Sequence, residues 1–213
     1  MIRIMKKLLL GVAAMVGGVH ASVACTGISL TATDGSYIQA RTIEWAYGPL
    51  KSEDVIIPRG QELQSYTPTG MNGLCFKARY GVVGLAVVER EFIAEGLNEA
   101  GLSAGLFFFP RYGSYEGYDS AHNDYTLADL QVVQWMLTQC ATIDEVKAAV
   151  ERVHIVGLEK TAVVHWRIGD PTGRQVVMEI VGGEVHFYEN EVGVLTNAPG
   201  YEWQLANLEN YVN

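Results

Sequence analysis

Apolar and polar residues alternate along much of the chain, and this two-residue period predicts β-strands. Residues 25–33 and 37–45 alternate on either side of an Asp34-Gly35 turn, which is the pattern of a β-hairpin. Further strands are expected between turn signals at 55–57, 74–78, 82–88, 92–96 and 102–109. The long stretch 110–124, which is rich in Gly and Tyr, is expected to form a loop.

In the middle of the chain the period changes to that of amphipathic helices. Thr126-x-x-Asp129 opens a run of apolar residues at helical spacing that reaches Leu137, and Thr142-x-x-Glu145 opens a second run. Strands are expected again at 162–168, 175–181, 184–188 and 192–196, before a last helix that begins near 199. Strand-rich blocks around an inserted pair of helices predict an α+β fold, in which helices cover antiparallel sheets.

Residues 1–24 have the pattern of a bacterial export signal. Three basic residues precede an apolar run at 8–19, and Ser22 and Ala24 are the small residues that signal peptidase recognises. Cleavage after Ala24 makes Cys25 the first residue of the mature protein. The expected organisation is therefore a signal peptide, 1–24, followed by one domain, 25–213, in a protein that is periplasmic or secreted.

A mature chain that begins at Cys25 carries a thiol and a free α-amine on one residue. The amine has an ordinary pKa of about 7.7–8.0, so it can take up the thiol proton near neutral pH and act as a built-in base. Two alternatives stay open. Residues 22–25 are also compatible with the acylated anchor of a lipoprotein, although Ser22 stands where a large aliphatic residue is expected, and Cys25 can be an ordinary terminal residue.

Charge narrows the range of partners. The leader holds three of the 15 basic residues and none of the 24 acidic ones, so the chain from Cys25 onward has 12 basic and 24 acidic residues and a formal charge of −12. A strongly acidic chain repels nucleic acid and anionic membranes. After the leader, no apolar run approaches the roughly 18 residues of a membrane-spanning helix. Neither nucleic acid nor membrane insertion is therefore expected.

The remaining cysteines and the histidines have plain structural interpretations. Cys75 and Cys140 lie in apolar runs and are expected to be buried, with a disulfide between them left open. The histidines show no metal-ligand spacing, so no metal and no cofactor are expected. His165 is interpreted as a structural histidine in a strand. Cys25 is left as the thiol without a structural role.

A series of short motifs resembles the choloylglycine hydrolase family of N-terminal-nucleophile amidases, which includes bile salt hydrolases and penicillin V acylases. In family order, the motifs are Cys25-Thr26-Gly27 and residues 40–45, 58–60, 96–102, 165–170, 195–199 and 207–211. The leader and the variant at 41–45 look most like Gram-negative, Bacteroides-type members. The resemblance implies a four-layer αββα sandwich. Because the family pattern continues beyond the last motif, it also implies that the C-terminal part of the family domain is absent here.

The resemblance also implies roles for individual residues. Cys25 is the expected nucleophile, Arg41 the cation that favours its thiolate, Glu44 the acid that orients the α-amine, and Asn197 the amide that donates to the oxyanion. Glu44 stands where most members have Asp, which lengthens the side chain without changing its charge. The alternatives are a surface ion pair between Arg41 and Glu44, and a strand-end turn at Asn197.

The aromatic run at 107–109 departs from the family, which often has Asn or Tyr at the position of Phe107. Phe107 is expected to line an apolar substrate pocket, although three Phe residues in a strand are more often plain core. The predicted partner is a small-molecule amide, with conjugated bile salts favoured. A homo-oligomer is also expected, since family members are often tetramers.

The sequence therefore predicts an enzyme that hydrolyses linear amide C–N bonds with an N-terminal cysteine nucleophile, and deconjugation of bile salts is the favoured reaction. A penicillin V acylase or another N-acyl amide hydrolase is the alternative within the same class. A lipoprotein, or an inactive truncated pseudoenzyme, is the alternative of a different class.

Overall fold

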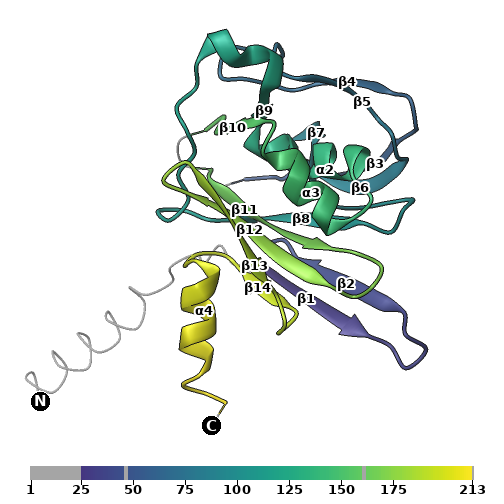
Figure 1. The fold of residues 1–213 in the computed structure, drawn as a ribbon, viewed down its shortest axis with the longest axis vertical. Coiled ribbons are helices and arrows are strands. Elements are labelled where there is room, and N and C mark those ends of the chain that lie inside the picture. Colours follow the sequence, from purple (N-terminus) through teal and green to yellow (C-terminus); the bar gives the residue numbers. More distant parts are fainter. Residues whose placement is uncertain (1–24, 46–47, 160–161, 213) are drawn as a thin grey trace, which may run out of the picture.

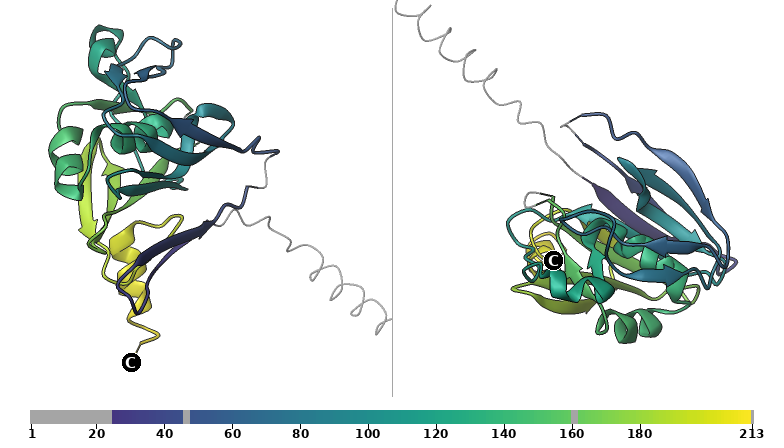
Figure 2. Two further views of the ribbon diagram at one scale, coloured as in Figure 1. Left: turned by 90° about the vertical axis from the view of Figure 1, so that its right-hand side faces the viewer. Right: turned by 90° about the horizontal axis from the view of Figure 1, so that it is seen from above.

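The structure, a computed structural model, describes residues 25–45, 48–159 and 162–212. The predicted signal peptide lies outside the described residues. Two antiparallel sheets pack face to face, one of seven strands in the order β13-β12-β11-β8-β7-β6-β3 and one of three strands in the order β14-β1-β2 (Figures 1 and 2). Helices cover the other face of the larger sheet, so the fold is α+β, as predicted.

The strands of the two sheets form where the alternating pattern predicts them, whereas β4, β9 and β10 were not predicted as strands. The larger sheet contains β3 (Glu53–Ile57), β6 (Val82–Val87), β7 (Glu89–Asn98), β8 (Ser103–Phe108), β11 (Val164–Gly169), β12 (Gln175–Val181) and β13 (Glu184–Glu189). The smaller sheet contains β1 (Thr26–Thr31), β2 (Tyr37–Thr42) and β14 (Val194–Thr196). Two short pairs, β4 (Glu62–Gln64) with β5 (Cys75–Lys77) and β9 (Thr126–Ala128) with β10 (His154–Val156), complete the strands.

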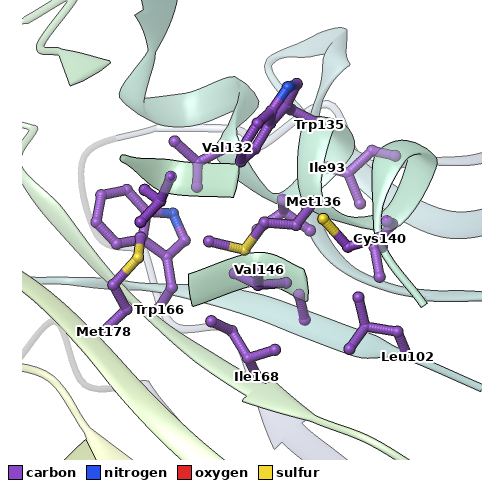
Figure 3. Close-up of a cluster of buried hydrophobic side chains, with 14 of the residues drawn as sticks. Ile93, Leu102, Val132, Trp135, Met136, Cys140, Val146, Trp166, Ile168 and Met178 are labelled. Carbon is purple, nitrogen blue, oxygen red and sulfur yellow. The ribbon is translucent and has the colours of Figure 1, made fainter. Parts of the chain in front are cut away.

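The helical layer consists of α2 (Val132–Gln139) and α3 (Ile143–Val150), and α4 (Tyr201–Leu208) follows β14. The capping pattern predicted for α3 is present, because Thr142 Oγ1 accepts a hydrogen bond from the N–H of Glu145 and Glu145 reaches back to the N–H of Ala141. The main core lies between this layer and the larger sheet. Figure 3 shows Met136 of α2 extending toward Trp166 of the sheet, in the same cluster as Met178.

The helix predicted to open at Thr126 begins later. Thr126 to Ala128 form β9, which pairs in parallel with β10, and a short 3-10 helix, η2 (Asp129–Gln131), separates β9 from α2. The Thr126 hydroxyl donates to the carbonyl of His122 instead of capping a helix. Pairing with a strand some 28 residues further on therefore overrides the local helical spacing.

The central strand β11 has two different faces. Trp166 and Ile168 belong to the apolar core under the helices, whereas His165 and Arg167 are fully buried on the opposite face, toward the smaller sheet. Successive side chains of a strand point to opposite sides, so the apolar core and the buried polar groups are separated by the sheet itself. His165 and Arg167 are therefore buried polar groups between the two sheets.

The cysteines are only partly where the sequence suggests. Cys140 is buried, as expected, but Cys75 is exposed, because it lies on the outward face of the short β4–β5 pair. All three cysteines are free, so Cys75 and Cys140 form no disulfide in this structure.

The described residues leave the outer face of the smaller sheet uncovered. The smaller sheet exposes Ile28, Leu30 and Ile38 on its outer face, so a complete four-layer sandwich is not formed by the described residues. Within the same residues, no helix combines the length and the apolar character needed to cross a lipid bilayer.

Candidate active site

An apolar cavity of about 340 Å³ lies beside Cys25, between the end of the smaller sheet and strands β7 and β8 of the larger sheet. Cys25, Arg41 and Glu44 are on its wall, and most of the remaining lining is apolar. That apolar lining includes Ile43, Leu50, Val87, Phe92, Leu106, Phe108, Leu130, Leu158 and Val164. The arrangement suits an apolar group bound next to a thiol.

Strand pairing brings Cys25 and Asn197 to the same end of the smaller sheet. Cys25 directly precedes β1 and is 6% exposed. The antiparallel register pairs Thr26 with Thr196, so one further step places Cys25 opposite Asn197. Residues opposite each other in antiparallel strands have Cα atoms about 4.5–5.5 Å apart. Two of the predicted site residues are therefore neighbours because of the register, although Asn197 follows Cys25 by 172 positions in the sequence.

Arg41 crosses from β2 to the larger sheet. Its Nη1 donates to the carbonyls of Ala94 and Leu106, and the guanidinium lies 4.1 Å from the centre of the Phe107 ring. Burial lowers the pKa of Arg41, while the charges of Glu95 and Cys25 oppose that change. A guanidinium keeps its proton in proteins, so the site holds a fixed cation close to the Cys25 thiol.

Two charged residues that the sequence did not single out as site residues complete this cluster. Glu95 accepts from Arg167 Nη2 at 3.2 Å and lies 3.7 Å from Arg41 Nη1. Burial raises the pKa of the Glu95 carboxyl, and the two guanidinium groups oppose the rise. Two cations and one carboxylate leave the cluster with a net positive charge beside Cys25.

A glycine makes room for this cluster. In the larger sheet Gly105 of β8 pairs with Glu95 on one side and with Arg167 on the other. A Cβ atom on Gly105 would lie 1.9 Å from Glu95 Oε2. The missing side chain therefore lets Glu95 and Arg167 meet above the strand that separates them.

The structure corrects the placement expected for Phe107. Its ring is fully buried in contact with the guanidinium groups of Arg41 and Arg167 and does not line the cavity. Because side chains alternate along β8, it is Leu106 and Phe108 that face the cavity. Phe107 supports the two guanidinium groups instead, as an aromatic face does in a cation–π contact.

Glu44 lies on the cavity wall and Asn197 lies opposite Cys25, and the catalytic roles expected for both stay predictions. Glu44 follows β2 as an exposed residue on the cavity wall, and the buried ion pair of Arg41 is formed with Glu95 rather than with Glu44. Asn197 lies in the turn after β14, where Gln204 Nε2 donates to its carbonyl at 2.8 Å. Asn197 therefore lies in a turn at the strand end, as the alternative interpretation predicts, and its role as an oxyanion donor stays a prediction.

Asp129 organises part of the cavity wall. Its Oδ1 accepts from the N–H groups of Leu130, at 2.9 Å, and of Leu158, at 3.3 Å, and both leucines line the cavity. Tyr115 stands beside it and bonds both the N–H and the carbonyl of Val164, a third wall residue. Burial raises the pKa of Asp129 to about 7.

This raised pKa predicts a specific dependence of stability on pH. The folded protein binds the Asp129 proton more tightly than the unfolded chain, whose ordinary pKa is 3.8, so this contribution is complete below about pH 4 and is lost as the pH rises through 7. The loss amounts to about 4 kcal/mol. In urea unfolding between pH 4 and 8, Asp129→Asn is expected to gain stability relative to the parent by this amount. A pH-independent difference would contradict the prediction.

The described residues contain no group of three His, Cys, Asp or Glu side chains arranged to hold a metal ion. His165 bonds Glu179 and the carbonyl of Thr196 in the interior, which confirms its interpretation as a structural histidine.

Comparison with known proteins identifies the family. Residues 25–213 match the model of the linear amide C–N hydrolases, choloylglycine hydrolase family, and the chain belongs to that family. The match begins at Cys25, the first residue after the predicted leader.

Curated relatives and solved structures agree with this assignment. The bile salt hydrolase/transferase of Clostridium perfringens is 29% identical over 195 residues, which cover 88% of this chain and 57% of that protein. A crystal structure of a mutant conjugated bile acid hydrolase from the same species matches with a TM-score of 0.74 at 27% identity, and penicillin V acylase from Agrobacterium tumefaciens with 0.75 at 25%. Each of these two structural matches covers 88% of this chain; they cover 57% of the bile acid hydrolase and 56% of the acylase. The chain thus spans somewhat more than half the length of these relatives.

Proposed function

We propose that this protein hydrolyses linear amide C–N bonds of N-acyl substrates, with Cys25 as an N-terminal nucleophile and conjugated bile salts as the favoured substrates. The observation that carries the proposal is the position of Cys25, on the wall of an apolar cavity and next to the buried cation of Arg41. Membership of the linear amide hydrolase family supports the reaction class.

The proposed reaction proceeds in two steps. Cys25 Sγ attacks the amide carbonyl while the α-amine of the same residue takes up the thiol proton and passes it to the leaving amine, which leaves an acyl thioester. Water, deprotonated by the α-amine, then attacks the thioester and releases the acid and the free thiol. Asn197 donates to the oxyanion in both steps. Glu44, on the cavity wall, orients the α-amine.

The choice of bile salts rests on the character of the cavity and on the relatives. An apolar cavity accepts a steroid acyl group, and several of the matched relatives are bile salt hydrolases. Penicillin V is the alternative, because the acylase from Agrobacterium tumefaciens matches the fold equally well. The aromatic acyl group of that substrate also suits a wall that contains Phe92 and Phe108.

Export and processing are part of the proposal. The α-amine of Cys25 exists only after cleavage of the bond to Ala24, since in the 213-residue chain the nitrogen belongs to a peptide bond. We therefore place the active protein in the periplasm or outside the cell, without its leader. Acylation of Cys25 as a lipoprotein would consume the thiol, and assembly into a tetramer stays a prediction.

One experiment tests both processing and substrate. The chain expressed with its leader in a Gram-negative host is expected to begin at Cys25 by intact mass, without added lipid, and to hydrolyse glycocholate and taurocholate faster than penicillin V. An extra alanine between Ala24 and Cys25 turns the amine into an amide and is expected to abolish turnover. Faster cleavage of penicillin V would overturn the substrate choice. A free Cys25 without turnover on any of the three amides would contradict the proposed function.

A further inference from the structure

A histidine and a glutamate are buried side by side between the two sheets. His165 in β11 is fully buried, and Glu179 in β12 is 2% exposed. His165 Nδ1 lies 3.0 Å from Glu179 Oε1, and the imidazole stacks on Phe109 at 4.3 Å. Packing alone does not require such a pair, because apolar residues of similar volume fill the same space at lower cost.

The hydrogen bonds of this pair go to the backbone on both sides of Asn197. His165 Nε2 donates to the carbonyl of Thr196 at 2.9 Å, and Thr196 immediately precedes Asn197. Glu179 Oε1 accepts from the N–H of Tyr201 at 2.9 Å, at the first residue of α4. One pair of side chains therefore holds both ends of the loop 197–200.

His165 uses both of its ring nitrogens in this arrangement. A carbonyl oxygen can only accept, so His165 Nε2 carries a proton toward Thr196. The contact between Nδ1 and Glu179 holds a second proton, which lies between the two groups. A side chain with one polar atom, or with none, would lose one end of the connection between the loop and the larger sheet.

Gln204 fixes the same loop from the side of α4. Its Nε2 donates to the carbonyls of Asn197, at 2.8 Å, and Pro199, at 2.7 Å, and its Oε1 accepts from the hydroxyl of Thr196. These bonds hold the loop to its own helix. The bonds of His165 and Glu179 determine where the loop lies relative to the larger sheet.

We infer that the His165–Glu179 pair is a positioning element for Asn197, an inference that rests on the proposed role of Asn197 as oxyanion donor. Such a donor is effective only when it lies about 2.7–3.1 Å from the oxyanion. A displacement of about 1 Å can lower a rate about 10²-fold. Because the oxyanion exists in the transition state and not in the bound substrate, loss of the pair lowers kcat more than it raises KM.

A double variant separates this role from a purely structural one. His165→Phe/Glu179→Met keeps a ring next to Phe109 but leaves the carbonyl of Thr196 and the N–H of Tyr201 without these partners, so some stability is lost and thermal unfolding is measured to show that the variant is folded. We expect kcat to fall about 10- to 100-fold, with KM changed less than about twofold. In an Asn197→Ala background, the same double change is expected to lower kcat by less than about twofold. Equal losses in both backgrounds would overturn the inference, because the pair would then act independently of Asn197.

A second measurement does not need turnover. The side-chain amide resonances of Asn197, assigned by their loss in Asn197→Ala, are expected to shift in the double variant. They are expected to stay in place in a His122→Gln control, because His122 contacts Tyr125 and His154 instead of the loop. Unmoved resonances in the double variant would overturn the inference whether or not the protein hydrolyses amides. Shifted resonances in a protein whose parent is inactive would contradict only the proposed function.

Discussion

Replacing Cys25 by serine is expected to lower amide turnover on the order of 10³-fold or more, because losing a nucleophile leaves only the contributions of binding and of the oxyanion donor. A hydroxyl at this position is far less nucleophilic than a thiol next to a base and a fixed cation. The fold is expected to survive, since serine is no larger than cysteine and its neighbours Leu195 and Tyr201 keep their packing. Turnover of glycocholate and thermal unfolding of the variant measure the two effects separately.

The other two cysteines supply matched controls for this prediction. Cys75 is exposed on the β4–β5 pair, away from the cavity, so Cys75→Ser is expected to keep full turnover. Burial raises the pKa of the Cys140 thiol to about 12, so this thiol stays protonated and inert to alkylation near neutral pH. In the Cys75→Ser variant, alkylation at Cys25 alone should therefore abolish turnover. Appreciable turnover in Cys25→Ser, or in the alkylated protein, would contradict the assignment of the nucleophile.

Local patterns were sufficient to predict the elements that carry most of the expected site. The hairpin with Arg41 follows from alternation around the Asp34-Gly35 turn, and both signals lie within a few residues of each other. The start of α3 follows from the spacing of Thr142 and Glu145 in the same way. Motif resemblance added Asn197, which no local pattern connects to Cys25.

The buried charges could not be predicted in this way. Glu95 becomes part of the site through the register of β7, β8 and β11, and register between distant strands is not encoded in any one of them. Arg167 stands inside one of the family motifs, but the motif alone does not tell which way its side chain points. Gly105 was the available signal, because a glycine within a strand often marks a close approach of other groups.

A strand prediction also leaves open which face is buried against which partner. Phe107 and Phe108 are equally apolar in sequence, and a shift of one residue exchanges their surroundings completely. Phe107 supports the two guanidinium groups, and Phe108 lines the cavity. At Thr126 the helical spacing of apolar residues is present, but parallel pairing with β10 determines the outcome.

Replacing Glu95 by glutamine is expected to lower the free energy of unfolding by about 3 kcal/mol. The two side chains have nearly the same size, so glutamine fits above Gly105, but Arg41 and Arg167 then lack a carboxylate. Their side chains are 6% and 0% exposed, so water cannot replace the missing charge. The Glu95 side chain is 23% exposed, which places the effect at the lower end of the range for buried ion pairs.

Turnover of Glu95→Gln is expected to fall as well, since Arg41 loses the charged partner that holds it beside Cys25. Glu99→Gln is the matched control, because Glu99 pairs with Arg59 on the surface, where the side chains are 41% and 65% exposed. Loss of an exposed pair changes stability by less than about 1 kcal/mol. Urea unfolding of both variants compares the two ion pairs directly. If Glu95→Gln and Glu99→Gln were equally stable, the buried charges would not hold the sheets together at the site, and the fixed cation beside Cys25 would need another explanation.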